Sequence, residues 1–232
     1  MPRGPSYDQP VTSPSFAPRA LVFDFDGLIL DTETPEFVAW QEVFAAYGAQ
    51  LTTEDWAHVI GSTDHGWDAG ASILRQTGEA VPEEALRAKF KARQVSLLEA
   101  ETIRPGVVAL ITAGRERGLS LGVASSSPRW WVEGHLNRLG LISEFSAVTT
   151  GDEVPRTKPD PAVYRLAVSR LGVPAESALA LEDSPNGVHA ALAAGLRCVA
   201  VPNSVSRHLD LSAADAVLDS LALLDLETLP FR

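Results

Sequence analysis

Short apolar runs recur along this chain, and most of the gaps between them hold helical patterns. The runs occupy residues 20–25, 119–124, 147–150, 178–181, 197–201 and 216–218. Strand-like runs that alternate with helical patterns are typical of parallel strands joined by crossover helices. The sequence therefore predicts an α/β fold, a doubly wound, Rossmann-like parallel sheet with helices on both faces.

Serine or aspartate followed by proline marks three expected helix starts. An N-cap residue before a proline at the first helical position is predicted at Ser127-Pro128, Asp160-Pro161 and Ser184-Pro185. Glycines follow where these helices should end, at Gly140, Gly172 and Gly195.

The stretch from residue 32 to residue 103 breaks the alternation. Its aromatic residues recur at helical spacing and predict one apolar helix face, formed by Phe37, Trp40, Phe44 and Tyr47. A second amphipathic pattern is carried by Leu86, Phe90, Leu97 and Leu98. We therefore expect a small α-helical cap domain at 32–103, inserted into a catalytic core formed by 19–31 and 104–232.

The first 18 residues are rich in proline and serine and contain no apolar run. They match neither a helix or strand pattern nor the apolar segment of a signal peptide. We expect a disordered tail at 1–18.

Charge and composition limit the partners. The formal net charge is −11, whereas nucleic acids and anionic membranes require clustered Lys and Arg. No stretch approaches the roughly 18 consecutive apolar residues of a membrane span, so we expect neither partner. The single cysteine, Cys198, excludes an intramolecular disulfide. It fits a reducing compartment, and we expect a cytoplasmic protein.

Acidic residues follow the first strand-like run. In the segment DFDGLILDTE, at 24–33, Asp24 and Asp26 flank Phe25 where the run ends. Both carboxylates can therefore reach the carboxyl edge of the sheet, and Gly27 allows a sharp backbone turn.

Three further polar segments also follow strand-like runs. ASSS at 124–127 offers hydroxyls and the free N–H groups of a helix start, which favour phosphate. TKPD at 157–160 offers Lys158, and EDS at 182–184 adds Glu182 and Asp183. Each segment is weak evidence alone, but their combination points to phosphate chemistry.

Together these motifs resemble those of the haloacid dehalogenase superfamily, in its branch of β-phosphoglucomutase-like phosphatases and mutases with a helical cap. The resemblance covers about residues 19 to 227 in order, and DxDGxxxDTE is its most specific motif. It implies that Asp24 attacks phosphorus to form an aspartyl-phosphate. Asp26 would protonate the leaving oxygen and later deprotonate the attacking water.

The resemblance also implies a Mg²⁺ cofactor. Its ligands would be the side chains of Asp24 and Asp183 and the backbone carbonyl of Asp26, an oxygen set that suits Mg²⁺. Glu182 is either an acid that orients metal-bound waters or a solvated loop residue, and we favour the first. Lys158 would neutralise the carboxylates and the phosphoryl oxygens.

Phosphate would bind the Ser125 hydroxyl and the Ser126 backbone N–H, while Ser127 is expected to cap a helix. Trp130 and Trp131 are interpreted as one packed and one partly exposed ring. Asp152 and Glu153 could reach the metal or remain solvated.

Cap residues are expected to contact the leaving group of a small phosphorylated metabolite. The candidates are Glu33, Glu36, Gly61, Ser62, Thr63, Asp64 and Trp67. Relatives that act as β-phosphoglucomutases carry a His and an Arg where this chain has Glu36 and Asp64, and two acids would repel a second phosphate.

We therefore predict a monomeric Mg²⁺-dependent phosphatase for a small phosphate monoester, such as a sugar phosphate; the alternative is a β-phosphoglucomutase-type mutase. A dehalogenase would lack the second acid, Asp26. A non-enzymatic binding protein would not need the intact set of Asp24, Asp26, Lys158 and Asp183.

Overall fold

A computed structural model describes residues 16–57, 67–229 and 231. Its centre is a six-stranded parallel sheet with the strand order β3-β2-β1-β4-β5-β6. The strands are β1 (Ala20–Phe23), β2 (Ser120–Ala124), β3 (Ala147–Thr149), β4 (Ala178–Glu182), β5 (Arg197–Ala200) and β6 (Ala216–Val217). This order defines a doubly wound Rossmann-like sheet, so the predicted fold class is confirmed.

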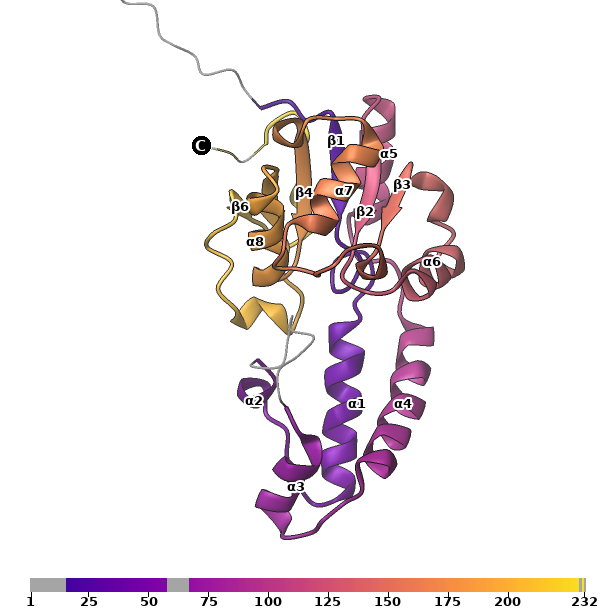
Figure 1. Cartoon of the computed structure of the whole chain (residues 1–232), viewed down its shortest axis with the longest axis vertical. Coiled ribbons are helices and arrows are strands. Elements are labelled where there is room, and N and C mark those ends of the chain that lie inside the picture. The colour runs from indigo at the N-terminus through magenta and orange to yellow at the C-terminus, as the bar shows by residue number, and fades with distance from the viewer. Residues whose placement is uncertain (1–15, 58–66, 230, 232) are drawn as a thin grey trace, which may run out of the picture.

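Helices cover both faces of the sheet (Figure 1). They are α5 (Val107–Glu116), α6 (Arg129–Arg138), α7 (Ala162–Leu171) and α8 (Pro185–Ala193). In β1, Leu21 and Phe23 pack in one cluster with α5 and α6, whereas Ala20 and Val22 pack in another with α7 and α8. Because successive strand residues point to opposite faces, the fully buried β1 can be apolar throughout.

Between β1 and α5, the described residues contain four helices, which form what we call the helical insert: α1 (Glu33–Ala46), α2 (Thr53–Ala57), α3 (Ala69–Thr77) and α4 (Glu83–Ala100). In Figure 1, α1 and α4 run side by side below the sheet. The insert has an apolar cluster that includes Trp40, Phe44, Trp56 and Leu86. This cluster is distinct from the two clusters of the sheet, although Val205, from the segment after β5, also belongs to it.

The chain enters and leaves the helical insert through two neighbouring segments. Leu30 and Ile103 form an antiparallel bridge, and the Arg104 N–H donates to the Ile29 carbonyl at 2.9 Å. The Arg104 guanidinium also donates to the Gly27 carbonyl, and to the Pro202 carbonyl at 2.9 Å. These bonds fix both crossings beside the loop that carries Asp24 and Asp26.

Two of the three expected helix starts are displaced by one residue. Pro128 and Pro161, rather than the preceding Ser127 and Asp160, occupy the N-cap positions of α6 and α7. The third start is as predicted, because Ser184 caps α8 and its hydroxyl accepts from the Gly187 N–H at 3.2 Å.

The predicted tail at 1–18 overlaps the described residues at its end. Phe16 packs against Phe231 with ring centroids 5.3 Å apart, at the edge of a sheet cluster. Phe16 therefore belongs with the core, and residues 1–15 lie outside the described residues.

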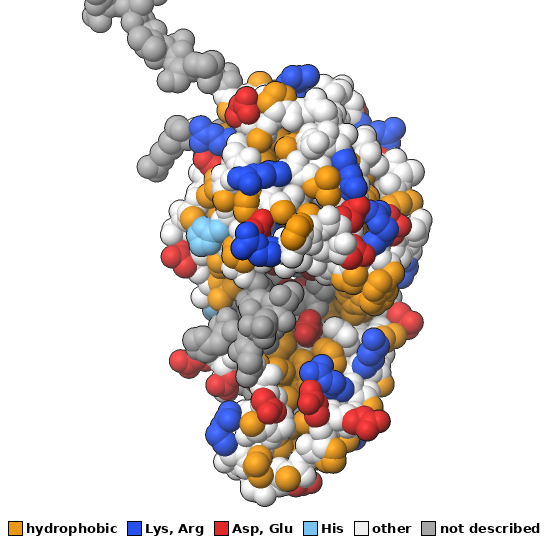
Figure 2. All heavy atoms as spheres, viewed as in Figure 1, with side chains coloured by type: hydrophobic (Ala, Val, Ile, Leu, Met, Phe, Trp, Pro, Cys, Tyr) orange, Lys and Arg blue, Asp and Glu red, His pale blue; other side chains and the backbone are white. Residues whose placement is uncertain are grey.

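The surface in Figure 2 shows Lys and Arg side chains as separate patches interspersed with acidic and apolar ones. The visible face thus offers no continuous basic surface of the kind that polyanions require. None of the helices described is long and apolar enough to cross a membrane.

Candidate active site

The site lies beyond the carboxyl ends of the central strands. Asp24 follows β1, Ser125 follows β2, and Asp183 follows β4. Its core lies between β1 and β4, where the direction of strand order reverses and such sheets bind ligands. The fold therefore brings together residues that are far apart in the sequence.

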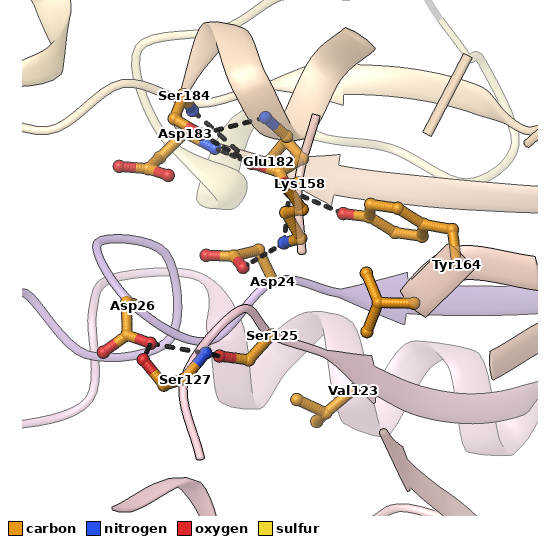
Figure 3. A network of polar contacts seen from close by, with 12 residues as sticks. Asp24, Asp26, Val123, Ser125, Ser127, Lys158, Tyr164, Glu182, Asp183 and Ser184 are labelled. Atoms are coloured by element: carbon orange, nitrogen blue, oxygen red, sulfur yellow. Dashed lines mark hydrogen bonds and ion pairs between the residues drawn. The ribbon is translucent and has the colours of Figure 1, made fainter. Parts of the chain in front are cut away.

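Lys158 joins two of the acids. Its Nζ forms ion pairs with Asp24 Oδ1 and, at 2.6 Å, with Glu182 Oε1 (Figure 3). Burial alone would lower the pKa of Lys158, but the two carboxylates outweigh it and raise that pKa above its ordinary value. Lys158 is therefore a permanent buried cation.

Glu182 is completely buried, so it is not a solvated loop residue. Its Oε1 accepts from the Tyr164 hydroxyl at 2.6 Å, and its Oε2 accepts from the Asp183 N–H at 3.1 Å. The Tyr164 ring also lies 5.0 Å from the Lys158 ammonium. Glu182 is thus positioned to hold Lys158 in place.

Three buried acids meet at this point. Asp24, Glu182 and Asp183 each offer a carboxylate oxygen, and these oxygens lie within 4.8 Å of one another. Burial raises the pKa values of Asp183 and Asp24 well above the usual range of an aspartate, and the neighbouring negative charges add to this shift. The positive charge of Lys158 opposes the shift at both residues. Because all donors are oxygens and the acids crowd together, the cluster fits a hard divalent cation such as Mg²⁺.

Asp183 is oriented by a residue that sequence reasoning missed. Asn203, itself buried, donates from Nδ2 to Asp183 Oδ2 at 2.7 Å. The Asn203 side-chain oxygen accepts from the N–H groups of Val205 and Ser206 at 2.9 and 2.8 Å. These bonds fix the orientation of the amide, so Asn203 holds one oxygen of Asp183.

Asp26 is held by three donors (the two serines appear in Figure 3). Ser125 and Ser127 donate to its Oδ2 at 3.1 and 2.7 Å, and the Trp131 indole N–H donates to its Oδ1 at 2.8 Å. The prediction that Ser127 caps a helix is therefore wrong, because its hydroxyl is used by Asp26 and the α6 start has no side-chain cap.

The predicted phosphate-binding serines lie in the turn between β2 and α6. Ser125 is fully buried, and its Oγ accepts from the Ser127 N–H at 2.9 Å while donating to Asp26. Ser126 lies between them in the same turn. The turn thus places the Ser125 hydroxyl beside Asp26.

The first turn of α1 brings two more acids to the site. Glu33 and Glu36 are half-buried. Burial raises the pKa of Glu33 to about 8, and the negative charges of Glu36 and Asp26 add to this shift. Burial, together with the negative charge of Asp26, raises the pKa of Glu36 to about 7. A further predicted contact, Trp67, packs edge-on against Trp40 and Trp56 in the helical insert. The other predicted contacts, Gly61, Ser62, Thr63 and Asp64, lie outside the described residues.

Asp152 and Glu153 are engaged elsewhere. Glu153 pairs with Arg129 at 2.6 Å and with Arg170 at 2.7 Å. Hydrogen bonding to Arg170 lowers the pKa of Glu153 to about 2, against a smaller opposing effect of burial. Asp152 accepts from the Arg129 N–H at 3.2 Å. Both acids therefore anchor the start of α6.

Comparison with known proteins agrees with this geometry. Residues 21–201 match the sequence model of the haloacid dehalogenase-like hydrolases. The chain is 43% identical over 211 residues to the "Putative phosphatase YhcW" of Bacillus subtilis, covering 91% of this chain and 96% of that protein. It is 32% identical over 205 residues to the "Phosphorylated carbohydrates phosphatase" of Thermotoga maritima, covering 86% of this chain and 92% of that protein.

This chain also has the same fold as a protein of known structure. The crystal structure titled as a "putative beta-phosphoglucomutase from Thermotoga maritima" superposes with a TM-score of 0.71 at 27% identity, covering 88% of this chain and 95% of that chain. The family match and these relatives show that the protein belongs to the haloacid dehalogenase-like hydrolases, in their β-phosphoglucomutase-like branch.

Proposed function

We propose that this hydrolase is a Mg²⁺-dependent phosphatase that hydrolyses a small phosphate monoester, such as a sugar phosphate, through a phosphoryl group carried on Asp24. The observation that carries the proposal is the buried Asp24, paired through Oδ1 with Lys158, next to the hydrogen-bonded acid Asp26. Two relatives, the "Putative phosphatase YhcW" and the "Phosphorylated carbohydrates phosphatase", support the reaction class.

In the first step, a carboxylate oxygen of Asp24 attacks phosphorus while the bond from phosphorus to the leaving oxygen breaks. The protonated carboxyl of Asp26 gives its proton to that oxygen, so an alcohol leaves and Asp26 becomes a carboxylate. The Lys158 ammonium, held by Glu182 at 2.6 Å, stabilises the negative charge on the transferring group.

In the second step, water hydrolyses the acyl phosphate. The Asp26 carboxylate takes a proton from the water as its oxygen bonds to phosphorus, and the bond between phosphorus and Asp24 breaks. Inorganic phosphate leaves, Asp24 is again a carboxylate, and Asp26 is again protonated. One residue thus serves as acid and then as base.

Asp24 and Asp183, with the Asp26 carbonyl, would hold Mg²⁺, which when bound supplies positive charge to the phosphoryl oxygens. Within the described residues, the three clustered acids fit this role because their oxygens lie within 4.8 Å of one another. Asn203 keeps one oxygen of Asp183 occupied at 2.7 Å and so orients the other.

Hydrolysis is favoured over the mutase reaction by the charges of α1. A mutase must bind a second phosphate through its cap, and here Glu33 and Glu36 face the site from the first turn of that helix. Neither side chain can supply the positive charge that such a group requires, and each repels it once ionised. The mutase is the second candidate because one structural relative is described as a putative beta-phosphoglucomutase.

The test is product analysis with a panel of phosphorylated metabolites, with Mg²⁺ or with EDTA. We expect phosphate release from one or a few monoesters with Mg²⁺ only. Asp24→Asn should lower the rate by at least about 10³-fold. Asp152→Asn should stay near the wild-type rate, because the Asp152 carboxylate accepts from Thr150 and from the Arg129 N–H rather than from residues of the site. Conversion of β-glucose 1-phosphate to glucose 6-phosphate without phosphate release would refute the proposed hydrolysis.

A further inference from the structure

The start of α6 contacts the Asp26 loop through an aromatic ring. The Trp131 indole N–H donates to Asp26 Oδ1 at 2.8 Å, across 105 residues of sequence. We infer that Trp131 is a positioning residue for the acid and base of the reaction, because it fixes the Asp26 carboxyl and determines which of its oxygens carries the proton. This inference rests on the proposed function.

The two oxygens of Asp26 meet different kinds of donor. Oδ2 faces the hydroxyls of Ser125 and Ser127, and a hydroxyl can either donate or accept. Oδ1 faces the Trp131 indole, which can only donate. When Asp26 is protonated, Oδ1 must therefore remain the acceptor, and the proton belongs on Oδ2.

That choice suits the chemistry of the site. Oδ2 is the oxygen beside Ser125, the hydroxyl expected to bind the phosphoryl group. A proton on Oδ2 is therefore carried on the side of Asp26 that faces the Ser125 and Ser127 turn, where the phosphate ester would bind. Trp131 can keep its bond to Oδ1 while Oδ2 gives up the proton and later regains it.

Trp131 is held firmly enough to position another group. Its ring packs edge-on against His135 at 4.4 Å between centroids, and His135 stacks on Phe25 at 6.1 Å. Phe25 lies between Asp24 and Asp26 in the sequence, so α6 contacts this loop at two points. The helix start is anchored in turn by the ion pair of Arg129 with Glu153 at 2.6 Å.

The neighbouring ring provides a matched control. Trp130 precedes Trp131 in α6, but it is 69% exposed, whereas Trp131 is partly buried against the sheet cluster. Trp130→Phe and Trp131→Phe make the same chemical change in adjacent residues. Only the second removes a donor to Asp26.

The experiment compares an alkyl phosphate substrate with 4-nitrophenyl phosphate, whose phenolate leaves without protonation. The comparison uses kcat/KM, which reports the steps up to departure of the leaving group and so leaves out the second step, which both substrates share. Since general acid catalysis contributes about 10²–10⁴-fold, we expect Trp131→Phe to lower kcat/KM for the alkyl phosphate about 10- to 100-fold. The loss for 4-nitrophenyl phosphate should stay below about 3-fold. Trp130→Phe should leave the ratio of the two rates unchanged, and Trp131→His, which can restore an N–H donor, should recover part of the loss.

Equal losses on both substrates, or no loss on either, would overturn the role of Trp131. Asp26→Asn separates this outcome from failure of the proposed function. If that variant hydrolyses the alkyl phosphate as fast as the wild type, Asp26 is not the acid and the proposed function itself fails. If it is selectively inactive but Trp131→Phe is not, only the inference on Trp131 falls.

A spectroscopic measurement does not require Trp131→Phe to fold. The chain contains five tryptophans, so a ¹⁵N spectrum should show five indole N–H signals. Asp26→Asn should shift one of them strongly, and it should not be the signal that Trp130→Phe removes. The absence of such a shift would refute the indole to carboxylate bond.

Discussion

Gly187, in the first turn of α8, is packed directly against the most buried acid of the site. A Cβ built on Gly187 would lie 1.9 Å from Glu182 Cδ and 1.9 to 2.0 Å from both carboxylate oxygens. Glu182 is completely buried and paired with Lys158 at 2.6 Å. Gly187→Ala must therefore displace the carboxylate by more than an ångström or push α8 away from the sheet.

The expected cost follows from two opposing effects. Alanine is preferred to glycine within a helix by about 1 kcal/mol. Disrupting a buried ion pair costs about 3–5 kcal/mol, because a charge is left without its partner. We therefore expect Gly187→Ala to lower the free energy of unfolding by about 2–4 kcal/mol. For a chain of this size, the unfolding midpoint would fall by roughly 4–16 °C.

Gly134→Ala is the control for this substitution. Gly134 lies within α6, and a Cβ there would meet nothing within 4 Å. That variant should gain up to about 1 kcal/mol from helix propensity alone. Thermal and urea unfolding of both variants would show whether each change raises or lowers the free energy of unfolding. EDTA is present so that metal binding does not contribute. If Gly187→Ala were as stable as wild type, the packing argument for Glu182 would be wrong.

Two further substitutions test the charges of the site. Tyr164→Phe removes the hydroxyl that donates to Glu182 at 2.6 Å but keeps the ring over Lys158. Urea unfolding should show that the free energy of unfolding falls by about 1.5–3 kcal/mol. The control, Tyr47→Phe in the helical insert, should lower it by less than about 0.5 kcal/mol. Glu33 has a pKa of about 8 in the folded chain against 4.5 as its reference value, so its ionisation destabilises the folded state as pH rises between those values. Glu33→Gln should therefore raise the unfolding midpoint in EDTA relative to wild type more at pH 9 than at pH 5, and an equal difference at both pH values would contradict the shift.

The strands were predictable because each is a short apolar run in a sheet covered on both faces. The helix starts were less predictable, because the local preference of a residue for the N-cap position competes with its tertiary contacts. Ser127 has the sequence context of an N-cap, yet its hydroxyl donates to Asp26 at 2.7 Å and Pro128 takes the cap position. The Ser184 hydroxyl also donates to Glu182, at 3.4 Å, but its oxygen still accepts from the Gly187 N–H at 3.2 Å and caps α8 as its sequence context predicts.

Site residues were predictable from the sequence where they directly follow strands. Parallel strands place their carboxyl ends at one edge, so Asp24, Ser125 and Asp183 had to meet. Tyr164, Trp131 and Asn203 carry no such signal, because their roles depend on which side chains approach them in the folded chain. Trp130 and Trp131 are adjacent and identical in type, and only helix packing decides which ring reaches Asp26.

Charge balance links the metal to the choice of substrate. Within the described site, five acids act on one another electrostatically: Asp24, Asp26, Asp183, Glu182 and Glu33. Lys158 is the cation paired directly with two of them, Asp24 and Glu182. A phosphate dianion would add further negative charge, so we expect it to bind only when a divalent cation offsets the acids. The first turn of α1 adds Glu33 and Glu36 but no basic residue, so a second phosphate placed there would find no opposing positive charge. We expect the same shortage of positive charge to produce both the proposed requirement for Mg²⁺ and the proposed preference for monophosphates, and Glu36→His should weaken that preference.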